Sequence, residues 1–117
     1  LDRAFALAVR QLDTRPECRG LYASLDRDGM SQLSTTLYVP VSPERERGIC
    51  RRALASTHVG GPATSVCGRF DALSDAEAAM VLLHEALHWS GLTERPMDPH
   101  GMSANDINEM VREACGL

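Results

Sequence analysis

Apolar residues in the first 25 positions recur every three or four residues, which is the spacing of one face of an α-helix. The first such stretch covers residues 2–13 and predicts an amphipathic helix, with apolar positions at Phe5, Ala8, Val9 and Leu12. Pro16 favours the first turn of a second helix. The apolar face of that helix carries Cys18, Leu21, Tyr22 and Leu25. We expect it to end at the Asp28-Gly29 turn.

The middle of the chain favours short strands and loops. Residues 31–47 are mixed: the pattern at 35–39 is typical of a strand, whereas two prolines bracket a charged loop that we expect to be a solvated surface without a site. Two strand-like runs follow at 53–58 and 64–70, and the sequence His-Val-Gly-Gly-Pro joins them. These runs and their glycine turn predict a β-hairpin.

The strongest helical pattern begins after Ser74. Ser74 and Glu77 have the spacing of a capping box, in which the serine accepts a hydrogen bond from the glutamate amide and the glutamate side chain reaches back. The helix should begin at Asp75 and continue through His88. Gly91 should end it, because glycine readily adopts the left-handed conformation that follows a helix.

A last helix is expected to begin after Ser103, with Asp106 at the capping spacing, and to end at Gly116. Its inward positions are Ile107, Val111 and either Ala114 or Cys115. These patterns together predict an α+β fold: a mostly helical single domain, 1–117, with a small β-hairpin or sheet packed on the helix that carries the candidate site.

Composition and charge narrow the class of protein. The 117 residues, 44% of them hydrophobic, suffice for one compact core and are too few for two domains. The net charge of -4 argues against a nucleic-acid partner. All twelve cations are arginine, which excludes every mechanism that needs a P-loop, Schiff-base or general-base lysine. The longest apolar run, 78–83, is too short to span a membrane.

The four cysteines are widely spaced and contain no Cys-x-x-Cys pair, which favours two disulfides over a metal knuckle. We expect Cys18 to pair with Cys50 and Cys67 with Cys115, because each pair would tie neighbouring segments. Four buried thiols are the alternative. Disulfides predict an exported protein, which is periplasmic, envelope-associated or secreted. The chain begins with Leu1 rather than methionine, so we expect a processed or trimmed product.

The most informative stretch is His84-Glu85-Ala86-Leu87-His88, an H-E-x-x-H motif inside the strongest predicted helix. Residues four apart lie about 40° apart around a helix, so both imidazoles point to one place. Two imidazoles with a carboxylate suit Zn²⁺. The glutamate on the same face can accept a proton from a metal-activated water.

The continuation extends the pattern to H-E-x-x-H-x-x-G-x-x-E through Gly91 and Glu94. A glycine here lets the chain reverse, so that residue 94 can return beneath the metal. The segment resembles the active-site segment of zincin metallopeptidases, with the glycine spacing of metzincins but with glutamate in place of their third histidine. Glutamate as third ligand resembles gluzincins, which usually supply it from a later helix. Residues 64–117 are also similar to small uncharacterised bacterial zinc-peptidase-like proteins.

The resemblance implies that His84 and His88 are zinc ligands, that Glu85 is the general base and that Glu94 is the third ligand. Other carboxylates and a histidine remain alternative third ligands: His100, Asp98, Glu109 and Glu113. In the alternative interpretation Glu94 is a solvated loop residue paired with Arg95. Met97 or Met102 could form the methionine turn of metzincins, although methionine is more often core filler.

Three side chains are candidate donors to the oxyanion of a peptidase reaction: His100, Tyr38 and Tyr22. We expect His58 to be a surface histidine at the hairpin turn. Trp89 either forms a wall of the cleft or packs beside the helix. The strand near 64–69 is expected to align an extended substrate.

These observations predict a zinc-dependent metallopeptidase that hydrolyses peptide bonds of a peptide or protein substrate with a metal-activated water. The alternative is a non-catalytic zinc- and disulfide-stabilised envelope or binding module. A third possibility is an inhibitor or toxin-like disulfide scaffold in which the motif is accidental and no metal binds.

Overall fold

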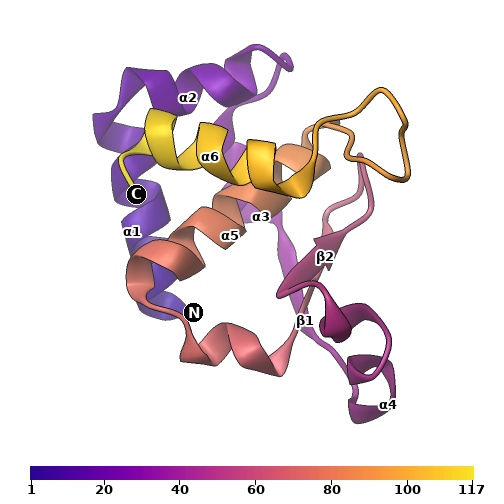
Figure 1. The fold of residues 1–117 in the computed structure, drawn as a ribbon. Coiled ribbons are helices and arrows are strands. Elements are labelled where there is room, and N and C mark those ends of the chain that lie inside the picture. Colours follow the sequence, from indigo (N-terminus) through magenta and orange to yellow (C-terminus); the bar gives the residue numbers. More distant parts are fainter.

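Helix α5, Asp75–Trp89, is the centre of the fold in the computed structural model, which describes residues 1–117 (Figure 1). It is apolar on nearly every side, and residues 78–88 are all buried. A helix of this kind needs partners on several faces. The elements packed against it are α1 (Asp2–Thr14), α3 (Gly29–Thr35), α6 (Ala104–Cys115) and β2 (Ala55–Thr57).

The N-terminal helices match the apolar pattern except at one boundary. Helix α2, Pro16–Ala23, has its proline in the first turn as expected but ends before the Asp28-Gly29 turn. Asp28 instead caps α3 and accepts a hydrogen bond from the Ser31 amide at 3.1 Å. The prediction that the second helix ends at this turn is wrong, because the Asp28 side chain satisfies a free amide at the start of the next helix.

The sheet has three strands in the order β1-β3-β2. Strands β2 and β3 (Ala63–Val66) pair antiparallel, which confirms the hairpin, although both are shorter than their sequence patterns. Strand β1, Leu37–Pro40, lies parallel to β3. Residues 68–70, expected to continue the strand, instead belong to the 3₁₀ helix η2, Gly68–Ala72.

A small arm joins β1 to β2. It contains α4, Pro43–Glu46, and the 3₁₀ helix η1, Ile49–Arg51, and Figure 1 shows α4 extending away from the helices. No residue of α4 is buried, as expected for a charged solvated loop. Glu46 anchors the arm by accepting a hydrogen bond from the Gly68 amide at 2.8 Å.

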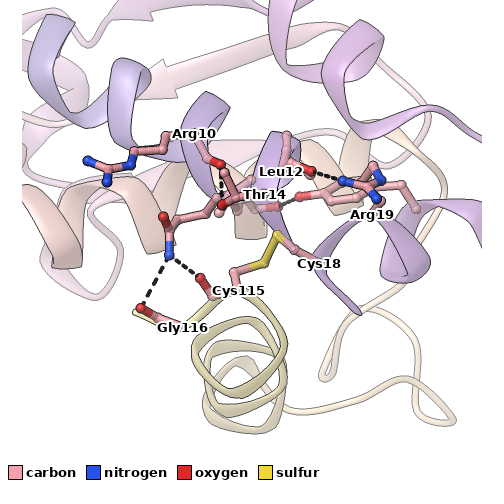
Figure 2. Close-up of a disulfide and its surroundings, with 10 residues drawn as sticks. Arg10, Leu12, Thr14, Cys18, Arg19, Cys115 and Gly116 are labelled. Atoms are coloured by element: carbon pink, nitrogen blue, oxygen red, sulfur yellow. Dashed lines mark hydrogen bonds between the residues drawn. A yellow bond between two sulfur atoms is a disulfide. The ribbon is translucent and has the colours of Figure 1, made fainter. Parts of the chain in front are cut away.

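The disulfides join Cys18 to Cys115 and Cys50 to Cys67, so the expected pairing is wrong. The prediction paired cysteines of neighbouring segments, whereas the packing of α2 against α6 joins two cysteines 97 positions apart in the sequence. Their Cα atoms are 4.6 Å apart. Figure 2 shows this bond between Cys18 and Cys115. The Gln11 side chain donates a hydrogen bond to the Cys115 carbonyl at 2.7 Å. The second bond joins the arm to the end of β3.

The helix ends behave as their residue types predict. Ser74 accepts a hydrogen bond from the Glu77 amide at 3.2 Å, and its hydroxyl donates to the Glu77 carboxylate at 2.9 Å. Ser103 caps α6 by accepting from the Asp106 amide. Gly116 ends α6 in the left-handed conformation, with φ 67°. None of these helices has the length and apolar character needed to cross a membrane.

Candidate metal centre

Two histidines on α5 form the core of the site. One helical turn separates His84 from His88, and their Nε2 atoms lie 3.1 Å apart. Both rings are almost enclosed: only 11% of the His84 side chain and 7% of the His88 side chain are exposed. Two buried imidazoles whose nitrogens converge need either a shared proton or a metal ion.

The chain reverses immediately after these histidines, and Gly91 makes the reversal possible. Its φ is 109°, a value that residues with side chains rarely adopt. The Gly91 amide donates to the His88 carbonyl, and the Leu92 amide donates to the Leu87 carbonyl, both at 3.0 Å. This double hydrogen bond is the Schellman arrangement of a helix end. It turns the following residues back toward the histidines.

Glu94 lies beside both histidines as a result. Its Oε1 atom is 2.9 Å from His84 Nε2 and 3.0 Å from His88 Nε2. Arg95 makes no ion pair with Glu94, in contrast to the alternative of a solvated loop carboxylate. One oxygen and two nitrogens therefore form a nearly equilateral triangle.

The dimensions of this triangle fit a small divalent ion. Ligand atoms at about 2.0–2.1 Å from a tetrahedral Zn²⁺ are about 3.3–3.4 Å from one another. The three observed separations are 2.9, 3.0 and 3.1 Å. Side-chain adjustments of a few tenths of an ångström would bring the three atoms to that spacing.

The far nitrogen of each imidazole is held by a hydrogen-bond acceptor. Nδ1 of His84 donates to the side-chain oxygen of Asn108 at 2.6 Å, and Nδ1 of His88 donates to the Leu92 carbonyl at 2.8 Å. Both acceptors place the ring proton on Nδ1 and leave the Nε2 lone pair free to bind a metal. The Schellman turn that ends α5 thus also orients His88.

Asn108 was not among the residues expected at the site. It lies on α6 one turn after Ala104 and three residues before the buried Val111. A polar residue at this spacing, on the side of α6 that packs against α5, is the one signal in the sequence that could have identified it. The signal indicates an inward polar residue but does not name its partner.

Glu85 lies next to the triangle and is buried, with 4% of its surface exposed. Its Oε2 atom has no hydrogen-bond partner. One carboxylate oxygen of Glu85 and one nitrogen of each histidine lie within 4.8 Å of one another. Glu94 contacts the histidine nitrogens directly, whereas Glu85 lies beside them with one carboxylate oxygen free.

Burial dominates the electrostatics of these groups. Burial away from solvent is the main cause that raises the pKa of Glu85 to about 8, and the negative charge of Glu94 is the second cause. Burial also lowers the pKa of His84, assisted by the nearby His88 and opposed chiefly by the hydrogen bond to Asn108. A neutral imidazole is the form that binds a metal.

The triangle lines an open cavity of about 490 Å³. Helix α5 contributes Val81, the two histidines and Glu85, and residues 52–57 form a wall along β2. Val59, residues 93–98, Ala104 and Asn108 complete the lining. This volume lies within the range of pockets for small ligands, about 300–1,000 Å³. The expectation that 64–69 aligns a substrate is wrong, because β3 is the central strand and the edge strand β2 lines the cavity.

The loop that presents Glu94 is organised by Asp98. This carboxylate accepts hydrogen bonds from the Thr93 hydroxyl at 2.7 Å and from the His100 amide at 3.0 Å, and they lower its pKa. Gly101 packs against the Glu94 backbone so closely that a Cβ atom would lie 3.0 Å from the Glu94 nitrogen. Asp98 therefore supports the loop from outside the triangle.

The structure places the remaining candidates away from the histidines. His100, Glu109 and Glu113 are exposed and do not line the cavity. Met97 is 95% exposed, and Met102 packs against the core. His58 is exposed, as expected.

The aromatic candidates also lie outside the cavity. The Tyr22 hydroxyl donates to the Leu83 carbonyl at 2.7 Å, and the Tyr38 hydroxyl donates to the Leu33 carbonyl at 3.3 Å. Neither tyrosine lines the cavity, nor does Trp89, whose indole donates to Thr35.

Comparison with protein-family models, curated proteins and solved structures found no match for this chain. The resemblance to zincins therefore depends on the H-E-x-x-H-x-x-G-x-x-E segment of the sequence alone and stays a prediction.

Proposed function

We propose that this protein is a zinc-dependent metallopeptidase. The observation that carries the proposal is the triangle of His84, His88 and Glu94, with donor atoms 2.9 to 3.1 Å apart, beside a buried carboxylate that has an unpartnered oxygen. Two imidazoles and one carboxylate are the ligand set of many catalytic zinc sites, and the cavity leaves room for a further ligand.

In such a site zinc supplies a Lewis acid that polarises a peptide carbonyl and acidifies water. His84, His88 and Glu94 would hold the ion, and the partners of the two Nδ1 atoms keep the imidazoles in the tautomer that can bind it. Glu85 takes the proton of the attacking water at its free Oε2 and returns it to the leaving amine. Burial raises the pKa of Glu85 to about 8, which makes its carboxylate a stronger base. The positive charge of a bound zinc ion would favour the ionised form that accepts the proton.

The substrate would lie along β2. This strand pairs with β3 on one side only, and its residues Ala55, Ser56 and Thr57 line the cavity. A free strand edge offers backbone donors and acceptors to an extended peptide.

Two disulfides are typical of proteins in an oxidising, exported environment. We propose that the peptidase acts in the periplasm, at the cell envelope or in the extracellular medium.

The test of catalysis is the substitution Glu85→Gln in zinc-loaded protein. We expect zinc to remain at one ion per chain by elemental analysis, while cleavage of a quenched fluorescent peptide library falls at least about hundredfold. Glu113→Gln makes the same chemical change at an exposed position on α6 and should leave both quantities unchanged. Equal cleavage by wild type and Glu85→Gln would overturn the mechanism.

The test of ligation is the substitution of each histidine. Structural zinc sites bind with about 10–16 kcal/mol in total, so one ligand contributes about 3 kcal/mol. We therefore expect His84→Ala and His88→Ala each to weaken zinc binding by at least about hundredfold, measured by competition with a chromophoric chelator. Wild-type protein that binds no zinc would end the proposal.

One observation favours the non-catalytic zinc and disulfide module as a second candidate. All three candidate oxyanion donors lie outside the cavity. If the module is correct, removal of zinc unfolds the protein and no peptide of a broad library is cleaved. If the peptidase is correct, zinc-loaded protein turns over peptides and Glu85→Gln does not.

A further inference from the structure

Two arginines line the cavity of the candidate metal centre. Arg52 lies just before β2, and Arg95 directly follows the ligand Glu94. They belong to different segments of the lining, and both are exposed. They are the only residues in the lining that carry a permanent positive charge.

Neither guanidinium has a partner within the protein. Arg52 and Arg95 make no ion pair and no side-chain hydrogen bond. Other arginines are engaged: Arg19 donates to the Leu12 and Asp13 carbonyls, and Arg69 donates to the Cys50 carbonyl.

The carboxylates of the cavity cannot serve as counterions without losing their present roles. Glu94 contacts both histidines, Asp98 accepts hydrogen bonds from Thr93 and His100, and Glu85 is buried. The two arginines therefore offer their donors to whatever enters the cavity. A planar guanidinium matches the two oxygens of a carboxylate.

Exposed apolar side chains accompany these charges. Val59 is 50% exposed and Met97 is 95% exposed, and both belong to the same lining. Apolar side chains that line a cavity offer contacts to an apolar group of a ligand. The lining thus combines cationic and apolar contacts on a protein with a net charge of -4.

We propose that Arg52 and Arg95 select peptide substrates that present a carboxylate next to an apolar residue. The carboxylate belongs either to an acidic side chain or to the C-terminus of the peptide. This inference rests on the proposed function, because it assigns a substrate class to the same cavity.

The test is peptide binding to zinc-loaded Glu85→Gln protein, which does not consume the probe. Three fluorescein-labelled hexapeptides of leucine and alanine are compared by fluorescence anisotropy. The first carries one internal glutamate and a C-terminal amide, the second has glutamine in place of that glutamate, and the third is the glutamine peptide with a free C-terminal carboxylate. Arg52→Gln with Arg95→Gln removes both charges. Arg51→Gln is the matched control, because Arg51 is exposed and does not line the cavity.

We expect the first or third peptide to bind about fivefold tighter than the amidated glutamine peptide, the sum of two partly exposed ion pairs. Whichever peptide shows the preference identifies the source of the carboxylate. The double arginine variant should abolish the preference, and Arg51→Gln should retain it. Equal binding of all three peptides, absence of binding, or an equal loss in Arg51→Gln would overturn the inference.

The same titration on protein stripped of metal with a chelator separates this inference from the proposed function. The arginines belong to the chain, so an arginine-dependent preference should persist without zinc, although binding becomes weaker. If the protein takes up no zinc but still prefers the carboxylate peptide, the proposed peptidase function is wrong and the carboxylate site is retained. If the protein binds zinc and cleaves peptides but shows no preference for a carboxylate, only the inference about the carboxylate site is wrong.

Discussion

The two histidines of the candidate centre are oriented in different ways. His88 depends on its own neighbourhood: its ring donates to the Leu92 carbonyl, and Leu92 is positioned by the turn at Gly91. His84 depends on Asn108, which belongs to another helix 24 residues further along the chain. One side of the centre is thus built from consecutive residues, and the other requires α5 and α6 to pack correctly.

The two imidazoles are therefore oriented by different kinds of contact, one local and one tertiary. A helix end and its turn form from hydrogen bonds between neighbours, so the His88 side needs little beyond the local chain. The orientation of His84 depends on how α6 packs against α5, because Asn108 lies on α6. The Cys18–Cys115 disulfide joins α6 to α2. Substitutions far from the histidines should therefore affect the two sides unequally.

The largest effect is expected from the disulfide that holds α6. By chain entropy, closure of a loop of 97 residues stabilises by about 4.7 kcal/mol, and closure of 17 residues by about 3 kcal/mol. Cys18→Ser with Cys115→Ser should lower the free energy of unfolding more than Cys50→Ser with Cys67→Ser, measured by urea denaturation. The first pair should also weaken zinc binding in the absence of urea. The reverse order of stabilities would show that the helical layer does not depend on its crosslink.

The next effect concerns the acceptor of His84. Asn108→Ala should lower zinc affinity about 10- to 100-fold, because outer partners of ligating histidines contribute that much. Asn108→Asp keeps an oxygen acceptor and should restore most of the affinity. Asn105→Ala, at an exposed position on the same helix, is the control. If Asn108→Ala and Asn105→Ala bind zinc equally, the contact to His84 has no role in orienting it.

The smallest effect is expected from the turn beside His88. Gly91→Ala places a side chain at a φ of 109°, which should cost about 1–2 kcal/mol of stability and displace Glu94 from the histidines. The control is Gly20→Ala in α2, where an added Cβ meets nothing within 4 Å and helix propensity should improve stability slightly. Thermal unfolding and zinc titration measure both variants. A Gly91→Ala protein as stable as wild type would mean that the turn tolerates a side chain.

The elements that the sequence predicts well are those whose signals are local. The capped helix after Ser74, the helix between Ser103 and Gly116 and the hairpin all follow from spacings of a few residues. Helix α3 escaped prediction because Asp28-Gly29 can end one helix or begin the next, and packing against Tyr22 favours the second: a Cβ on Gly29 would lie 2.7 Å from the Tyr22 ring.

The H-E-x-x-H-x-x-G-x-x-E segment already contains both histidines, the turn, Glu85 and Glu94, and an α-helix followed by a glycine reversal brings these residues to one place. Contacts between distant segments decide the rest: the parallel pairing of β1 with β3, the partners of the four cysteines, the acceptor on His84 and the wall that β2 forms. Hydrophobic packing brings these segments together. It is non-directional, so the order of residues along the chain does not say which surfaces will meet.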